Sequence, residues 1–225
     1  MSEPRDYGRE LYPFLYPEAP GAGPMAAALA LARQSTRQKC EDVLALRCQV
    51  RDEYQEQLGR AADAMAARWS RGGALLAFGN GGSATDAADA AADCLSPPVE
   101  GWRPLPALDL TADAAVLSAI GNDVGFHKVF LRQIIAYGRS GDIALGFSTS
   151  GNSRNVVDGI AEAARRGLLT VAISGSDGGT LAEPGLADFC FVARSEHIPR
   201  IQEGQATLWH LLLELVQERL GEGGP

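Results

Sequence analysis

Two short loops rich in small polar residues are the parts of this chain best suited to bind an anion. The first, Gly79–Ser83, reads GNGGS, and the second, Ser148–Ser153, reads STSGNS. The second loop places four hydroxyl groups around Gly151, directly before a predicted helix: Ser148, Thr149, Ser150 and Ser153. Hydroxyls and free backbone amides at a helix start can satisfy the three oxygens of a phosphate monoester. Helix capping needs only one such hydroxyl, so the loop predicts a phosphate site.

The first loop has more than one interpretation. Its glycines allow positive φ and a close approach of the backbone to a ligand, but a strand-to-helix turn alone often needs glycine. Gly79, Gly81 and Ala84 also fit a permissive dinucleotide fingerprint, with Glu100 at a suitable separation as the acidic residue. Glu100 lies in the proline-broken segment SPPVEGWRP, whereas the fingerprint requires the end of a strand. The fingerprint also leaves the second loop unexplained, so a dinucleotide site is disfavoured.

Carboxylate, amide and imidazole side chains recur at helical spacing in two segments. Asp89 and Asp93 are four residues apart, and Gln202 and His210 are eight apart, so each pair lies on one side of its predicted helix. These side chains are acceptable ligands for a divalent metal. The alternatives are solvated charges on an alanine-rich helix and an ordinary surface or core histidine. His127 and His197 are interpreted as structural.

The order of apolar runs and helical patterns predicts the elements that position these residues. Short apolar runs typical of buried strands alternate with helices, which indicates an α/β fold with a parallel sheet covered on both faces. The predicted strands are 74–79, 106–110, 142–147, 169–174 and 189–193. The predicted helices of this domain are 85–95, 155–167 and 201–220. Ligands of such sheets bind at the carboxyl ends of the strands, where both loops lie.

Three regions follow one another along the chain. Residues 1–24, with five prolines and three glycines, are expected to form an extended arm. Residues 25–71 are expected to form two helices, broken near 35–38, that supply an oligomer interface. Residues 72–225 are expected to form the ligand-binding domain.

Composition and charge exclude several classes of protein. The net charge of −8 disfavours nucleic-acid binding, because phosphate backbones attract basic surfaces. The chain has no apolar run of 18 residues, so no membrane span is expected, and its N-terminus carries no secretory pattern. The four cysteines are scattered without CxxC spacing and are expected to be reduced thiols. A cytoplasmic protein is expected.

The two loops and three further segments together resemble the sugar isomerase (SIS) domain family, and specifically its phosphoheptose isomerase branch. The resemblance extends over about residues 40–220 and includes these segments: GNGGSATDA, AIGNDVGF at 119–126, LGFSTSGNS, ISGSDGG at 173–179 and RIQEGQATLWHLL at 200–212. It implies a three-layer, flavodoxin-like parallel sheet. It also implies a homotetramer with active sites shared between subunits, and a sugar phosphate, most closely sedoheptulose 7-phosphate, as substrate.

The resemblance also assigns roles to residues. The second loop would hold the phosphate, and the first loop, comprising Asn80, Gly81, Gly82 and Ser83, would contact the sugar. Asp93 and His210 would be the acid/base pair for proton transfer through an enediol, with Gln202 beside the substrate. Zinc would be bound by four residues: Asp89, Asp93, Gln202 and His210.

Four departures from the family pattern bear on this assignment. Asp89 stands where the family has a zinc-binding histidine, and Asp93 where it has a catalytic glutamate. Pro97 replaces an arginine, and Pro199 replaces an aspartate. A related non-catalytic regulator, which binds the bacterial replication initiator, lacks the C-terminal histidine. The chain retains His210, which favours an enzyme over a sugar-phosphate-binding regulator.

Overall fold

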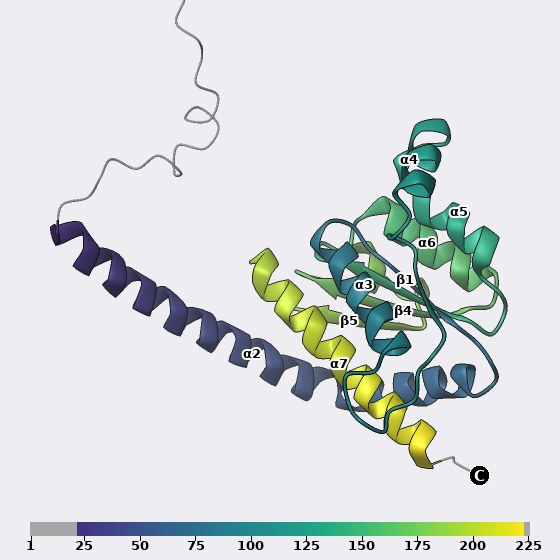
Figure 1. Cartoon of the computed structure of the whole chain (residues 1–225), viewed down its shortest axis with the longest axis horizontal. Helices are drawn as coiled ribbons and strands as arrows, with labels where there is room; N and C mark the ends of the chain where they lie inside the picture. Colours follow the sequence, from purple (N-terminus) through teal and green to yellow (C-terminus); the bar gives the residue numbers. More distant parts are fainter. Residues whose placement is uncertain (1–21, 223–225) are drawn as a thin grey trace, which may run out of the picture. The chain divides into compact units, whose positions relative to one another are not determined.

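A five-stranded parallel sheet forms the centre of the computed structural model, which describes residues 22–222 and the side chains of 25–221. The strand order is β2-β1-β3-β4-β5 (Figure 1), which is the flavodoxin-like order. The strands are β1 (Leu75–Phe78), β2 (Ala107–Asp109), β3 (Ile143–Ser148), β4 (Leu169–Gly175) and β5 (Phe189–Ala193). Each strand begins or ends within three residues of its predicted run, so the predicted α/β fold is confirmed.

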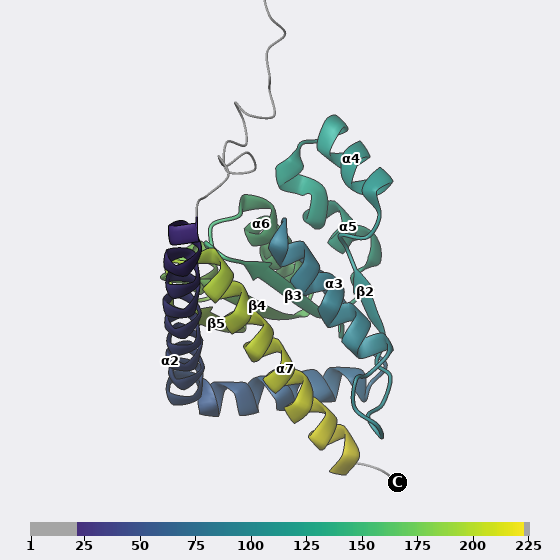
Figure 2. The same ribbon diagram turned by 60° about the vertical axis from the view of Figure 1, so that its left-hand side comes forward.

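Helices cover both faces of this sheet, because successive side chains of each central strand point in opposite directions. On β1, Leu75 and Ala77 join the core beneath α3 (Gly82–Leu95) and α7 (Ile198–Glu222). Leu76 and Phe78 join the opposite core, beneath α5 (Val129–Tyr137) and α6 (Arg154–Arg165). Figures 1 and 2 both show α3 and α7 side by side on their face of the sheet. These two neighbouring helices carry the predicted acid/base residues.

The N-terminal helical region is one helix, α2 (Ala22–Trp69), and the predicted break near 35–38 is wrong. The segment that suggested a break contains serine, threonine and glutamine but neither glycine nor proline, and such residues cost a helix interior little. Residues up to Asp42 form a separate compact unit, while Val43 onward belongs to the domain. There, Val50, Tyr54 and Leu58 join the same core as α3 and α7. The extended arm expected for 1–24 lies largely outside the described residues.

Three helical segments between β2 and β3 were not predicted: α4, η2 and α5. Helix α4 (Ala114–Asp123) begins after Asp113, whose carboxylate accepts hydrogen bonds from the amides of Ala115 and Val116 at 2.9 and 3.0 Å. This is the usual N-cap arrangement. The segment AIGNDVGF forms the end of α4 and the start of the short helix η2 (Phe126–Lys128). Among the helices described, none is long and apolar enough to span a bilayer.

Candidate active site

The first loop connects β1 to α3 and is covered by the side chain of Gln202 from α7. Gly81 has φ +57°, a conformation that L side chains rarely adopt, and a Cβ on Gly82 would overlap the Gln202 amide. The glycines are therefore required both by the turn and by the close approach of α7. The structure thus places the Gln202 side chain against Gly82 of the first loop.

Asn80 of the first loop is tied to α6 by a reciprocal pair of hydrogen bonds. Its Nδ2 donates to Oδ1 of Asn155, and Nδ2 of Asn155 donates to Oδ1 of Asn80, both at 2.8 Å. Asn155 is buried, and its Oδ1 also accepts the amide of Val156. Asn80 therefore fixes the position of the first loop relative to the second. Sequence reasoning missed Asn155, although it directly follows the STSGNS segment.

The second loop connects β3 to α6 and keeps several hydroxyls unused by capping. Ser153 occupies the N-cap position of α6, yet its side chain makes no capping hydrogen bond. Its Oγ instead accepts from Oγ of Ser148 at 3.1 Å. The Oγ of exposed Ser150 accepts the amide of Asn152 at 3.2 Å, and Thr149 is partly exposed. Hydroxyls at a helix start that are not consumed by the cap suit a phosphate group.

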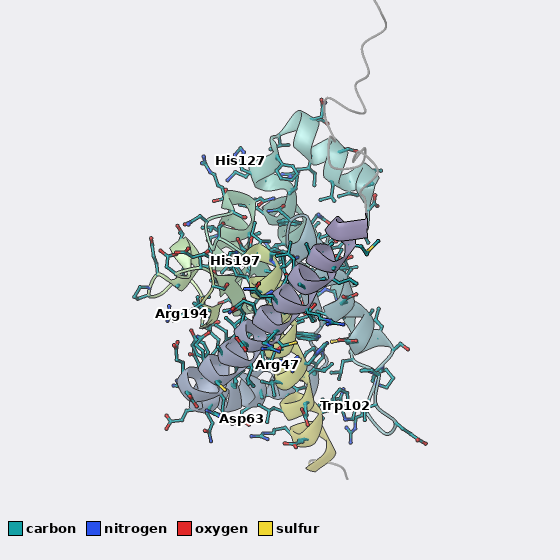
Figure 3. The ribbon with its side chains drawn as sticks, turned by 90° about the vertical axis from the view of Figure 1, so that its left-hand side faces the viewer. Arg47, Asp63, Trp102, His127, Arg194 and His197 are labelled. Carbon is teal, nitrogen blue, oxygen red and sulfur yellow. The ribbon has the colours of Figure 1, made fainter. Side chains whose placement is uncertain are left out.

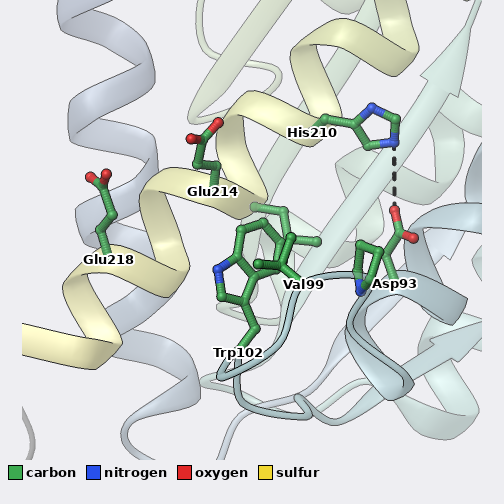
Figure 4. A pocket seen from close by; sticks show the side chains of 8 residues that line it. Asp93, Val99, Trp102, His210, Glu214 and Glu218 are labelled. Atoms are coloured by element: carbon green, nitrogen blue, oxygen red, sulfur yellow. Dashed lines mark ion pairs between the residues drawn. The ribbon is translucent and has the colours of Figure 1, made fainter.

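Asp93 and His210 face each other across α3 and α7. The Nε2 atom of His210 lies 3.7 Å from Oδ2 of Asp93 (Figure 4), and the same oxygen accepts a hydrogen bond from Nε1 of Trp209 at 3.0 Å. His210 is two-thirds exposed, whereas only 21% of the Asp93 side chain is exposed. A partly buried carboxylate beside an accessible imidazole is an arrangement that can accept and donate protons.

Two cavities adjoin this pair. A small one of about 60 Å³ is lined by Asp86, Asp89, Phe147, Ala206, Trp209 and His210. A larger one of about 550 Å³ is lined by Asp93, Pro98, Val99, Trp102, His210, Leu213, Glu214 and Glu218, several of which Figure 4 shows. Phe147 immediately precedes the second loop, so the small cavity connects that loop's strand with His210. The larger cavity has three carboxylates and no Lys or Arg in its wall, which disfavours a phosphate there.

Asp86 is a further acidic residue that the sequence interpretation did not assign to the site. It lies one turn before Asp89 on α3, and its Oδ2 is buried without a hydrogen-bond partner. Burial, and secondarily the charge of Asp89, raises the pKa of Asp86 to about 6. A perturbed carboxyl group in a cavity with an imidazole is typical of a functional site.

The predicted zinc ligands do not form one coordination group in this arrangement. Within residues 22–222, no three His, Cys, Asp or Glu side chains lie close enough together to hold a metal ion. Oδ2 of Asp93 is engaged by the Trp209 indole, and Gln202 lies against Gly82, two helical turns before His210. The donor set as arranged therefore does not fit zinc, and the zinc site stays a prediction.

The residues set aside in the sequence lie elsewhere. Figure 3 shows His127 and Trp102 at opposite ends of the domain, and neither His127 nor His197 lines the two cavities. Glu100 lies in a turn, and the end of β2 is Asp109, whose Oδ1 accepts the amide and hydroxyl of Thr111, each at 2.7 Å. The arrangement thus gives no support to the dinucleotide alternative.

The part of the chain that matches a known protein family contains this same region. The family model described as "SIS domain" matches residues 40–175, which include both loops and α3. The chain belongs to the SIS domain family.

Three relatives within the SIS family are phosphoheptose isomerases. A phosphoheptose isomerase of Aquifex aeolicus is 43% identical over 169 residues, covering 75% of this chain and 87% of the relative. One from Thermodesulfovibrio yellowstonii is 45% identical over 161 residues, covering 72% and 79%. The solved phosphoheptose isomerase of Neisseria gonorrhoeae is 33% identical, with a TM-score of 0.75 over 84% of this chain and 99% of that one. The SIS fold and the phosphoheptose isomerase branch are therefore both confirmed.

Proposed function

We propose that this SIS domain protein is a sugar-phosphate aldose–ketose isomerase that acts on sedoheptulose 7-phosphate by proton transfer through an enediol. The observation that carries the proposal is the pairing of Asp93 with His210, 3.7 Å apart, on α3 and α7, the two helices that meet at the first loop. Identity of 43% to a phosphoheptose isomerase over most of both chains supports it. The pair provides a base and an acid, and the loops provide a place for the phosphate.

The charge distribution orients the substrate. The phosphate group is expected at the second loop, where Thr149, Ser150 and Ser153 offer hydroxyls at the start of α6. The uncharged carbonyl end is then expected at Asp93 and His210, because the acidic wall of the larger cavity repels a phosphate. Ser83 of the first loop and Gln202, which lies against that loop, are expected along the sugar between these ends.

The reaction follows from the pair. Asp93 removes the proton from C1 of the ketose while protonated His210 gives a proton to the C2 carbonyl oxygen, which produces the enediol. Return of the carbon proton to C2, with loss of the O1 proton to His210, gives the aldose. An imidazole suits this step because it both holds and releases a proton near neutral pH.

The test is incubation of the protein with sedoheptulose 7-phosphate in heavy water. An isomerase incorporates deuterium at the carbons that exchange protons through the enediol and forms the isomeric aldose phosphate. Absence of both products, with sugar phosphate still bound in calorimetry, would reject the enzyme and support the alternative of a sugar-phosphate-binding regulatory protein.

Zinc, assembly and location extend the proposal. Zinc, if bound after rearrangement of the side chains, would be held by Asp89, Asp93, Gln202 and His210.

Large apolar side chains exposed along α2 support a homotetramer: Met25, Leu29, Leu31 and Leu44. A cytoplasmic location is supported by four free cysteines. Burial raises the pKa of Cys94 to about 12 and that of Cys190 to about 11, so both stay protonated and unreactive.

A further inference from the structure

Trp209 is the residue that most directly constrains the proposed base. It precedes His210 on α7, is only 2% exposed, and belongs to the hydrophobic core beneath α3 and α7. Its one polar atom, Nε1, donates to Oδ2 of Asp93 at 3.0 Å. Oδ2 is also the oxygen that lies 3.7 Å from His210. Trp209 and His210, which are consecutive on α7, therefore both lie against Oδ2 of Asp93.

This contact limits how the carboxylate can turn. An indole N–H is a donor only and carries no titratable proton, so it can donate at any ordinary pH. The indole ring is fixed by its burial, whereas the His210 ring is largely exposed. With Oδ2 held between the two rings, Oδ1 is left as the oxygen available to a substrate in the adjoining cavity, which Asp93 lines.

We propose that Trp209 is a positioning residue that orients Asp93 for proton abstraction. The inference rests on the proposed isomerase function and deepens it. Positioning of a reacting group matters because a displacement of about 1 Å is enough to slow an enzymatic step substantially. Trp209 itself touches no reacting atom and acts only through Asp93.

A packing role for Trp209 makes a different prediction, and the chain offers a matched control. Trp69 is also buried, at 6% exposed, and its Nε1 donates to the backbone carbonyl of Pro106 at 3.2 Å. Trp69→Phe and Trp209→Phe thus each keep a buried ring and each lose one indole hydrogen bond. Only the second change releases Asp93.

Steady-state kinetics with sedoheptulose 7-phosphate test the proposal. Trp209→Phe is expected to lower kcat about tenfold, because hydrogen bonds to charged groups are among the stronger ones. KM is expected to stay within about twofold, and Trp69→Phe is expected to leave both constants near those of the parent. In an Asp93→Asn background, Trp209→Phe is expected to have no further effect on kcat, since the residue acts through the carboxylate.

A spectroscopic measurement tests the contact even where a variant folds poorly. The chain has three tryptophans, so ¹H–¹⁵N spectra of the parent contain at most three indole signals. The signal assigned to Trp209 is expected to shift in Asp93→Asn, while that of Trp69 stays in place. An unmoved Trp209 signal, an unchanged kcat in Trp209→Phe, or an equal loss in both backgrounds would overturn the proposal. An inactive parent would overturn the proposed isomerase function together with the role of Trp209. An active parent that gave any of these results would overturn only the role of Trp209.

Discussion

The side-chain amides of Asn80 and Asn155 bind each other through two reciprocal hydrogen bonds of 2.8 Å, which join the first loop to the start of α6. Asn155 is 3% exposed. Buried amides carry both donors and acceptors, and the pair satisfies one of each on both residues. The relative position of the two loops is therefore set by side chains, in addition to the strands that carry the loops.

Replacing Asn155 by alanine is expected to affect both stability and substrate binding. The change leaves Asn80 without its partner, which costs about 1–3 kcal/mol of the free energy of unfolding. KM for the sugar phosphate is expected to rise, because the first loop loses the hydrogen bonds that join Asn80 to α6. Urea unfolding and steady-state kinetics measure the two effects. Gln38→Ala, which removes an exposed amide bonded to Asp42, is the control and is expected to change neither.

Replacing Ser150 and Ser153 together by alanine is expected to weaken sugar-phosphate binding by a few kcal/mol, as for lost hydrogen bonds to a charged group. The helix itself should be little affected, because the Ser153 side chain makes no capping bond. Calorimetry measures the affinity, and thermal unfolding monitors the fold. Ser118→Ala, which removes an exposed hydroxyl on α4, serves as the control. Unchanged affinity in the double variant would refute the phosphate assignment.

Asp93→Asn and His210→Gln are each expected to lower kcat about a hundredfold or more with the fold intact. The physical reason is that each variant removes a proton acceptor or donor without removing volume. Kinetics and circular dichroism measure the two properties. If both variants isomerise as fast as the parent, the acid/base pair is misassigned.

The same two variants test zinc. If the metal is bound through the predicted ligands, elemental analysis of the purified parent should find zinc, and either substitution should remove it. Full activity of a parent treated with chelator and shown to lack zinc would argue against a catalytic metal. Equal zinc content in parent and variants would place any bound metal elsewhere.

Asp86→Asn is expected to stabilise the protein at pH 7.5 and to have no effect near pH 3. The folded state raises the pKa of Asp86 to about 6, above the 3.8 of a free side chain, mainly through burial. The folded protein therefore binds the proton more tightly, and the parent loses stability as pH rises from about 4 to 6. The amide removes this buried charge. Melting temperatures of parent and variant across this range measure the difference, and a constant difference would contradict the assignment.

The protein is expected to be a tetramer, with a mass in light scattering about four times the 23.7 kDa of one chain. The exposed leucines of α2 are expected to be covered in the assembly, since burial of apolar surface drives association. Leu29→Glu together with Leu31→Glu should shift the mass toward smaller species, whereas Arg33→Glu should not. A monomer at micromolar concentration would contradict this expectation.

The sequence by itself determined the sheet and its two loops. Apolar runs at β1, β3, β4 and β5 are buried along their whole length or nearly so, which makes them readable without knowledge of their partners. The loops were equally readable, because glycine and hydroxyl residues follow the strand ends directly. The helical spacing of Asp89 with Asp93, and of Gln202 with His210, also depends only on local geometry.

Tertiary structure decided which of these residues meet. Asn155, Asp86 and Trp209 gained their roles from contacts between segments far apart in the chain, with 116 positions separating Asp93 from Trp209. No periodicity encodes such a contact, because it depends on how α3 and α7 pack on the sheet. The continuity of α2 was likewise hidden, since its polar residues near 35–38 allow both a helix and a break. Packing of two helices on one sheet face, rather than any local pattern, placed the Trp209 indole on the Asp93 carboxylate.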